Sequence, residues 1–550
     1  MGCLENIQAV INTWPDSEHQ AAIKAGVLAA YGVLKAETEE LTLGEKFLTK
    51  CLELCDVVKE DRYIILQRIQ ALIYLGVIWC GRENFPLARE YLEKSLKVFS
   101  QFQEENSQDI FRLSDLLNYS EYKPDNQGKS LDSLITHAYY YLAQVEGKAG
   151  NSIRSAELCH TTLSRQLDRP SFDWMDWTRN CATLSQFYLN QENFTAARYH
   201  LAASLVMMDR YKEDDLVVQD LEEEKGSKTE MEKEVKEKDE EDKNLEEENE
   251  NKESRRATEG IVSRFCAKYG LTLLEYSHCA NLSGEPLQDE VGSRDKCPVF
   301  SNLDVSSRLA EVTDKRIDDY ETGRIIFLWG QHHVTNAQLY YTKDERCSDY
   351  VELTRDLSQM YKHLIYFESD IDRKCKMHRR RADLLEPLNR ELSPVHYLLT
   401  IRQILFELGE IFSDMVDLKR DRWVKQPSNK HFASKVNTLV NQAILYFQTF
   451  LDTMKIEGAD PVKYVDDNTR PALLANFYLG RLASKYIVEE GSNKQLQNIN
   501  NTYTSYKKIV DYCVQNPEAV EKFGEELEAC KEMVRLLPVK MEKIRRGLIV

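Results

Sequence analysis

Glycine and proline are scarce in this sequence, which has 22 glycines and 13 prolines among 550 residues. Both residues interrupt regular structure, so their scarcity favours an ordered and mostly helical protein. Long apolar runs are lacking too, because stretches such as Leu75 to Cys80 fall far short of the ~18 residues that a membrane-spanning helix needs. No charged and apolar leader opens the chain, so we expect no secretory signal.

Regularly spaced cysteines and an excess of positive charge are missing as well. The 13 cysteines include no Cys-x2-Cys pair, so we expect reduced thiols in a cytoplasmic protein. Lysine and arginine total 72 against 91 aspartate and glutamate residues, which makes the net charge −19. This charge argues against nucleic acid and anionic membranes as partners and favours a basic partner.

Sequence motifs for catalysis are also lacking. The chain has no Gly-rich phosphate loop, His-Glu-x2-His pair, Gly-x-Ser-x-Gly elbow or EF-hand loop. Cys375 and His378 have the spacing of two metal ligands on a helix, but zinc needs about four and no second pair supports them. Two adjacent pairs face different sides of a helix and are interpreted as incidental: His332-His333 and Cys159-His160. We therefore predict a protein that is not an enzyme, with no catalytic residue, no metal and no cofactor.

What the sequence does contain is a repeated decapeptide. Glu83–Leu92 (ENFPLAREYL) recurs 109 residues later as Glu192–Leu201 (ENFTAARYHL). Each copy follows an apolar helical pattern with a small residue, Gly76 before the first and Ser185 before the second. This is the spacing of a tetratricopeptide helix pair, in which small residues let two antiparallel helices approach closely. Such pairs bury their apolar faces by stacking into a curved array, which is usually a binding surface and rarely a catalyst.

The same pattern predicts the organisation of the chain. Four helix pairs fit the pattern. The first two cover residues 25–58 and 69–102, the third begins near Thr136, and the fourth covers 178–211. A loop is inserted at 104–129. Helical periodicity resumes at Ile261 and continues over 325–341, 351–367, 395–418, 436–454, 471–488, 503–514 and 517–537. Nothing resembles a strand ladder. We predict an all-α protein of irregular tetratricopeptide-like helix pairs in two lobes, residues 1–211 and 259–550.

An acidic segment separates the two predicted lobes. Residues 221–255 hold 16 acidic and 8 basic residues with almost no apolar anchor. Such a segment cannot offset its own ordering entropy, so we predict that 212–258 is a solvated, disordered linker or a transient Glu/Lys helix. An electrostatic role towards a basic partner is the alternative to plain solvation.

The groove of a tetratricopeptide array is lined by first-helix residues on the side opposite the helix-pair contacts. From the repeat registers we predict these groove residues: His137, Tyr140, Tyr141, Gln144, Arg179, Thr183 and Gln186. Tyrosine and amide side chains suit recognition of a partner helix, and packing between repeats is an equal alternative for Tyr140. A groove that grips a C-terminal carboxylate needs lysine and asparagine. The early repeats instead place apolar residues in those slots, which argues against a co-chaperone: Ala29, Val33, Ile73 and Val77.

A basic run at Arg373–Arg381 leaves two interpretations open. It could form a nucleic-acid or phosphoinositide patch. The favoured alternative is structural, because Glu368, Asp370 and Asp372 stand just before the run and can neutralise it on a helix. In a solenoid the same run could also join the helices of neighbouring repeats.

The first three residues invite a lipidation hypothesis. Gly2 could carry a myristoyl group and Cys3 a palmitoyl group. Asn6 stands where the motif requires Ser or Thr, and no polybasic segment follows. An ordinary initiator sequence is therefore the favoured interpretation.

Several segments resemble a known family. Phe367–Arg381 (FESDIDRKCKMHRRR), followed by Leu385–Leu388 (LEPL), is similar to the signature segment of the KIF-binding proteins, the kinesin-binding proteins of animals. So are 140–145 (YYLAQV), 182–188 (ATLSQFY) and 531–542 (KEMVRLLPVKME). The similarity runs in order from about residue 20 to the end. The family's longer N-terminal extension is missing, and the 212–258 insert is more charged than expected.

The resemblance implies a two-lobed right-handed α-solenoid that grips kinesin motor domains. In that family, binding covers the motor's microtubule-binding face and so regulates motor activity. The resemblance also implies a cytoplasmic, cytoskeleton-associated protein with an indirect link to microtubules, in axonal transport, axon outgrowth and mitochondrial distribution. The rival expectation is a generic tetratricopeptide scaffold for other protein partners, without a preference for motors.

Overall fold

The computed structural model describes most of the chain, and the described residues are 18–104, 110–117, 129–169, 172–226, 238–284, 298–425, 430–454, 464 and 468–546. Within these ranges every regular element is a helix and no strand occurs. The predicted all-α repeat of helix pairs is therefore confirmed. The lipidation hypothesis for Gly2 and Cys3 falls outside the described residues.

The chain divides into two compact units. The first, here called the N-terminal unit, comprises Met1–Phe265 and Asp289–Glu311. The second, here called the C-terminal unit, comprises Cys266–Gln288 and Val312–Val550. The division falls inside one helix, α11 (Lys238–Ser283).

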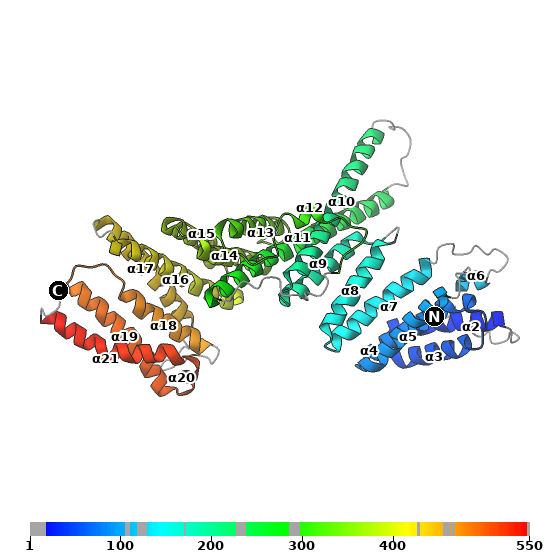
Figure 1. The fold of residues 1–550 in the computed structure, drawn as a ribbon, viewed down its shortest axis with the longest axis horizontal. Helices are drawn as coiled ribbons and strands as arrows, with labels where there is room; N and C mark the ends of the chain where they lie inside the picture. The colour runs from blue at the N-terminus through cyan, green and yellow to red at the C-terminus, as the bar shows by residue number, and fades with distance from the viewer. Residues whose placement is uncertain are drawn as a thin grey trace. The chain divides into compact units, whose positions relative to one another are not determined.

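Antiparallel helix pairs build the N-terminal unit (Figure 1). They are α2 (Glu18–Glu37) with α3 (Leu41–Cys55), α4 (Ile65–Gly81) with α5 (Phe85–Glu104), α7 (Lys129–Lys148) with α8 (Ser152–Leu167), and α9 (Trp174–Asn190) with α10 (Phe194–Gly226). All four predicted pairs are confirmed. A 3-10 turn, η1 (Asp61–Tyr63), precedes α4, and the predicted insert at 104–129 contains a short helix, α6 (Leu113–Leu117).

The turn inside each of these pairs has the same backbone geometry. A residue with positive φ follows the first helix: Glu39 (62°), Glu83 (61°), Gly150 (86°) and Glu192 (56°). The next backbone N–H then bonds back to the carbonyl five residues earlier, at 3.0 Å from Asn84 to Trp79 and at 2.9 Å from Asn193 to Tyr188. This arrangement is a Schellman motif, which satisfies carbonyls left open at a helix end. The Glu-Asn dipeptide of the repeated decapeptide therefore makes the turn.

Close approach of the paired helices explains the small residue before each turn. A Cβ atom on Gly76 would lie 2.6 Å from Leu92 Cγ and 3.2 Å from the Ala88 carbonyl oxygen. Leu92 and Ala88 are themselves fully buried. Any larger side chain would push α4 away from α5.

A segment from later in the chain completes the N-terminal unit. Residues 298–311, with the short helix α12 (Ser306–Leu309), return to pack on the last two pairs. The Phe300 ring stacks on His160 at 4.3 Å between centroids and lies 5.3 Å from Trp177. The Phe300 N–H donates to the Tyr199 hydroxyl at 2.6 Å. No repeat pattern in the sequence predicted this return.

The C-terminal unit holds the last part of α11 and the remaining helices of the chain. They are α13 (Tyr320–Tyr340), α14 (Cys347–Phe367), α15 (Ile371–Glu391), α16 (Pro394–Lys425), α17 (Lys430–Met454), α18 (Thr469–Ala483), α19 (Asn493–Gln515), α20 (Glu518–Lys522) and α21 (Gly524–Arg545). Two predicted stretches were too long. The helix expected over 471–488 ends at Ala483, and the one expected over 517–537 breaks at Phe523. The break occurs because Phe523 leaves helical geometry at φ −132° and turns its ring fully into the core.

The acidic segment between the predicted lobes is partly described. Helix α10 reaches Gly226 and helix α11 begins at Lys238, whereas 227–237 fall outside the described residues. The predicted disorder of 212–258 and the boundaries at 211 and 259 stay predictions.

A buried polar network holds α14, α15 and α16 together. Arg381 is 1% exposed, and its Nη2 donates to Glu407 Oε1 at 3.0 Å. Ser358 Oγ donates to the same oxygen at 2.6 Å. The end of the basic run therefore joins helices, which was one of the structural interpretations. In the described part of the chain, neutralisation by the preceding acids is limited to Arg373, which lies 3.5 Å from Glu368, because Asp372 pairs with Arg422 instead of Lys376. Cys375 and His378 are buried on α15, and the described residues contain no group of three or more metal-ligating side chains.

Candidate partner-binding groove

A hollow of about 610 Å³, here called the α7–α9 groove, opens between α7, α8 and α9 in the N-terminal unit. Helices α7 and α9 are the first helices of consecutive pairs, and α8 lies between them. The lining is mostly small or polar, with buried Leu163 and Ala156 among its apolar members. This composition suits a protein surface that offers both area and hydrogen bonds.

A second hollow of about 410 Å³ lies between α2, α4, α6 and α7. Its lining includes Gly26, Gln70, Leu113 and His137. His137 also lines the α7–α9 groove, so the two hollows meet at this residue. Together they follow the first helices of the pairs, which is where the repeat register predicted a binding surface.

Three of the predicted groove residues line the α7–α9 groove itself: His137, Tyr140 and Thr183. Tyr140 is 46% exposed, so packing between repeats leaves nearly half of its surface accessible. Gln144 is exposed on the same face of α7, one turn beyond Tyr140, but outside the lining.

The other predicted residues lie outside the lining and have partners of their own. Tyr141 is half-buried against the core between α4, α5 and α7, and burial raises the pKa of its hydroxyl. Arg179 forms an ion pair with Asp176 and donates to Thr258 Oγ1 of α11 at 2.9 Å. Gln186 Nε2 donates to Ser185 Oγ at 3.1 Å. Tyr141, Arg179 and Gln186 are therefore engaged within the protein, and their part in partner binding stays a prediction.

Sequence reasoning missed Gln166, which lines the groove from α8. Within the described part of the chain, no donor reaches its buried Oε1 atom. The Oε1 atom is closed to solvent, so a partner in the groove can contact the Gln166 side chain but not this oxygen. The signal was present in the spacing, because Cys159, Thr162 and Gln166 fall on one face of a helix. It was missed because only first helices were considered.

The groove carries little charge. Burial, with a further contribution from Arg169, lowers the pKa of His137, so the ring is neutral at pH 7. Asp176 is the acidic residue of the lining, and it is paired with Arg179. The groove therefore offers a concave surface with neutral hydrogen-bonding groups.

The nucleophile nearest to the groove is not activated. Burial raises the pKa of Cys159, which keeps the thiol protonated. The adjacent His160 faces the other way, with Nδ1 3.0 Å from His200 Nε2 in the core. The prediction that this pair faces different sides of the helix is confirmed, and the pair does not form a catalytic couple.

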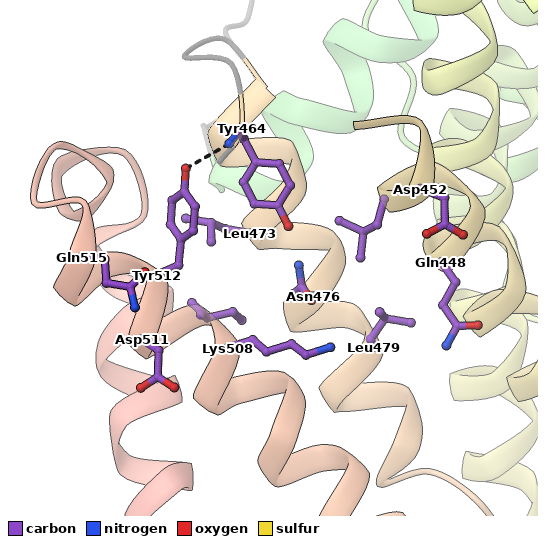
Figure 2. A pocket seen from close by; sticks show the side chains of 12 residues that line it. Gln448, Asp452, Tyr464, Leu473, Asn476, Leu479, Lys508, Asp511, Tyr512 and Gln515 are labelled. Carbon is purple, nitrogen blue, oxygen red and sulfur yellow. Dashed lines mark hydrogen bonds between the residues drawn. The ribbon is translucent and has the colours of Figure 1, made fainter. Parts of the chain in front are cut away.

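Figure 2 shows a third hollow, of about 520 Å³, in the C-terminal unit between α17, α18 and α19. Asn476 points into it from α18, and the Tyr464 N–H donates to the Tyr512 hydroxyl at 3.4 Å across one end. Its charged lining residues are of both signs: Asp452, Lys508 and Asp511. None of the residues predicted from the repeat register lies here, so the α7–α9 groove is the better candidate.

Comparisons with known proteins agree with one another. A family described as "KIF-1 binding protein C terminal" matches residues 175–544. The KIF-binding protein of Homo sapiens is 35% identical over 541 residues, which cover 96% of this chain and 85% of the relative. That of Drosophila melanogaster is 28% identical over 546 residues, which cover 96% of this chain and 86% of the relative.

Solved structures give the same result. One described as "Cryo-EM map of KIFBP" has a TM-score of 0.66 at 30% identity, over 100% of this chain and 94% of that chain. A structure of "Kinesin binding protein (KBP)" has a TM-score of 0.62 at 30% identity, over 98% of this chain and 92% of that chain. None of the described helices of the present chain is both long and apolar enough to span a membrane.

Proposed function

This chain belongs to the KIF-binding protein family, and on that premise we propose that it is a non-enzymatic adaptor that binds kinesin motor domains through the α7–α9 groove. Relatives named for kinesin binding share nearly its whole length. The observation that carries the proposal is the groove itself, a hollow of about 610 Å³ lined by the exposed Tyr140 and by polar side chains such as Thr183 and Gln166. A partner helix can fill such a groove with its side chains and form hydrogen bonds with this polar lining.

We further propose that binding blocks the motor's microtubule-binding surface. Motors contact acidic microtubules through basic surface, and a chain with a net charge of −19 is suited to compete for it. Opposite charge speeds encounter, and the neutral groove then supplies specificity. The link to microtubules is therefore indirect, and we place the protein in the cytoplasm, in regulation of axonal and organelle transport.

The groove is tested by substitutions that leave the fold intact. Gln166→Leu removes an amide from the lining and Thr183→Ala removes a lining hydroxyl. We expect the double variant to bind purified kinesin motor domains about 1–3 kcal/mol more weakly, as is typical for interface anchors. Isothermal titration calorimetry measures the affinity, and Gln101→Leu, an exposed glutamine on α5, is the matched control. Unchanged affinity in the double variant with normal helical circular dichroism would exclude this groove.

Residues predicted from the register alone receive a separate test. Tyr141→Ala with Gln144→Ala should also weaken motor binding, but Tyr141 packs on the core, so stability must be measured alongside affinity. Lost binding together with a lower unfolding temperature would assign Tyr141 to packing.

Occlusion is tested by co-sedimentation with microtubules. Motor domain mixed with the protein should remain in the supernatant, whereas motor domain alone pellets. Motor that pellets equally well while bound contradicts the blocking mechanism. If a panel of motor domains binds neither the protein nor its variants, the generic scaffold is the better account.

A further inference from the structure

The basic run on α15 has two faces with different environments. Met377, His378 and Arg381 are buried against α14 and α16. Arg373, Lys376 and Arg380 are exposed on the opposite side. These three stand at i, i+3 and i+7, so they form one stripe that runs roughly 10 Å along the helix. We call them the α15 stripe.

Ion pairs neutralise the neighbours of the stripe but not the stripe itself. Arg379 Nε lies 2.9 Å from Asp383, and Arg422 of α16 lies 2.6 Å from Asp372. Arg373 has a long contact of 3.5 Å with Glu368, and its side chain remains 63% exposed. Among the described residues, Lys376 and Arg380 form no ion pair. Lys376 and Arg380 therefore carry exposed positive charges that no ion pair neutralises within the described part of this acidic chain.

We propose that the α15 stripe binds a short acidic segment of a protein partner. Carboxylates spaced one or two helical turns apart match the spacing of Arg373, Lys376 and Arg380. This surface involves none of the residues of the α7–α9 groove, so it provides a second contact that is independent of motor binding. Since the net charge of the chain is −19, an acidic partner is repelled elsewhere and directed to this stripe.

The narrowness of the stripe favours a peptide over a nucleic acid or a membrane. Asp372 and Asp383 are exposed next to the stripe on α15, so the band of positive potential is narrow. A nucleic acid or an anionic membrane presents charge over a much larger surface and would also meet these acids. A short peptide can follow the stripe without meeting them.

The test uses the full chain and a fluorescein-labelled glutamate-rich peptide at low ionic strength. Lys376→Ala with Arg380→Ala should weaken peptide binding about fivefold in fluorescence anisotropy, and added salt should weaken wild-type binding. The matched control is Lys46→Ala with Lys50→Ala, an exposed pair at the same spacing on α3 that also lacks an ion pair. This control should bind the peptide as the wild type does.

Other outcomes overturn the proposal. An equal loss in both double variants would show a general charge effect with no site on α15. Single-stranded oligonucleotide or phosphatidylserine vesicles that bind through Lys376 and Arg380, when the peptide does not, would assign the stripe to nucleic acid or membrane. Motor-domain affinity of the Lys376→Ala, Arg380→Ala variant should equal that of wild type, so failure here is distinguishable from failure of the groove.

Discussion

The helix pairs of the N-terminal unit and the helices α13 to α16 of the C-terminal unit are connected by different means. In the N-terminal unit each pair turns through a positive-φ residue, and local backbone hydrogen bonds close the turn. In the described connections from α13 to α16, no residue has positive φ. There, side chains form the joints: buried Glu368 accepts the N–H of Ser369 at 2.8 Å, and Asp370 accepts the N–H of Arg373 at 2.7 Å. The connection between two packed helices can therefore be made by backbone hydrogen bonds or by hydrogen bonds to charged side chains.

This difference predicts where single substitutions do most damage. A backbone turn tolerates many side chains, because its hydrogen bonds use main-chain atoms. A buried charged network tolerates few, because loss of one partner leaves the other charge unopposed. The C-terminal unit should therefore respond more strongly to the loss of one charged side chain.

The largest expected effect comes from Arg381 in the C-terminal unit. Arg381→Met leaves Glu407 buried without its cation, which should cost about 3–5 kcal/mol in the free energy of unfolding. The double variant Arg381→Met, Glu407→Leu should recover most of that loss. Urea unfolding followed by circular dichroism measures both. A single variant as stable as wild type would show that the network does not hold α14, α15 and α16.

The matched substitution in the N-terminal unit is Arg89→Met. Glu146 is fully buried there, but it also accepts from Asn151 Nδ2 at 2.7 Å and lies 3.7 Å from Arg154. Because these donors remain, we expect a smaller loss of about 1.5–3 kcal/mol. If Arg89→Met lowers the free energy of unfolding as much as Arg381→Met does, the two units do not differ in their sensitivity to the loss of a buried charge partner.

Acid should weaken the N-terminal unit through its buried histidine pair. His200 Nδ1–H donates to the Ala196 carbonyl at 2.7 Å, so Nε2 accepts from His160 Nδ1–H. Burial lowers the pKa of His160 to about 4 and that of His200 to about 3. The unfolded chain binds protons near pH 6.5 and the folded chain does not, so stability is lost as pH falls below 6.5.

The expected loss by pH 5 is on the order of 2 kcal/mol per histidine, relative to pH 7.5. His200→Gln should flatten this dependence for the N-terminal unit, and Trp177 fluorescence reports on the site because the ring lies 5.3 Å from Phe300. The C-terminal unit has a comparable pair, His278 and His363, with Nδ1 atoms 2.9 Å apart. An unchanged slope in His200→Gln would show that His200 does not carry the acid sensitivity.

The smallest expected effects are at the turns. Gly150→Ala places a side chain at φ 86°, which should cost about 1 kcal/mol although the space around it is open. Glu192→Gly relieves the same strain and should stabilise by about 0.5 kcal/mol. Gly524→Ala is the control, since it also has open space but no positive φ. Thermal unfolding measures all three, and a Gly524→Ala cost equal to that of Gly150→Ala would exclude a turn-specific effect.

Much of the N-terminal unit could be predicted because the residues that form each contact within a pair lie close together in the sequence. The Glu-Asn dipeptide, Gly76 and the helical apolar pattern act within one pair, so a short stretch of sequence contains both sides of each contact. The groove was predicted only in part. His137, Tyr140 and Thr183 follow from first-helix registers, whereas Gln166 lies on a second helix whose burial depends on three helices meeting.

The sequence by itself determined the helix pairs, the acidic balance and the family. Only the tertiary structure decided that Phe300 returns to the N-terminal unit and that Arg381 points inward while Arg380 points outward. Helical periodicity shows that two residues face different ways, but it does not show which face meets another helix. That choice depends on contacts with residues such as Glu407, 26 positions away, and only folding brings those together.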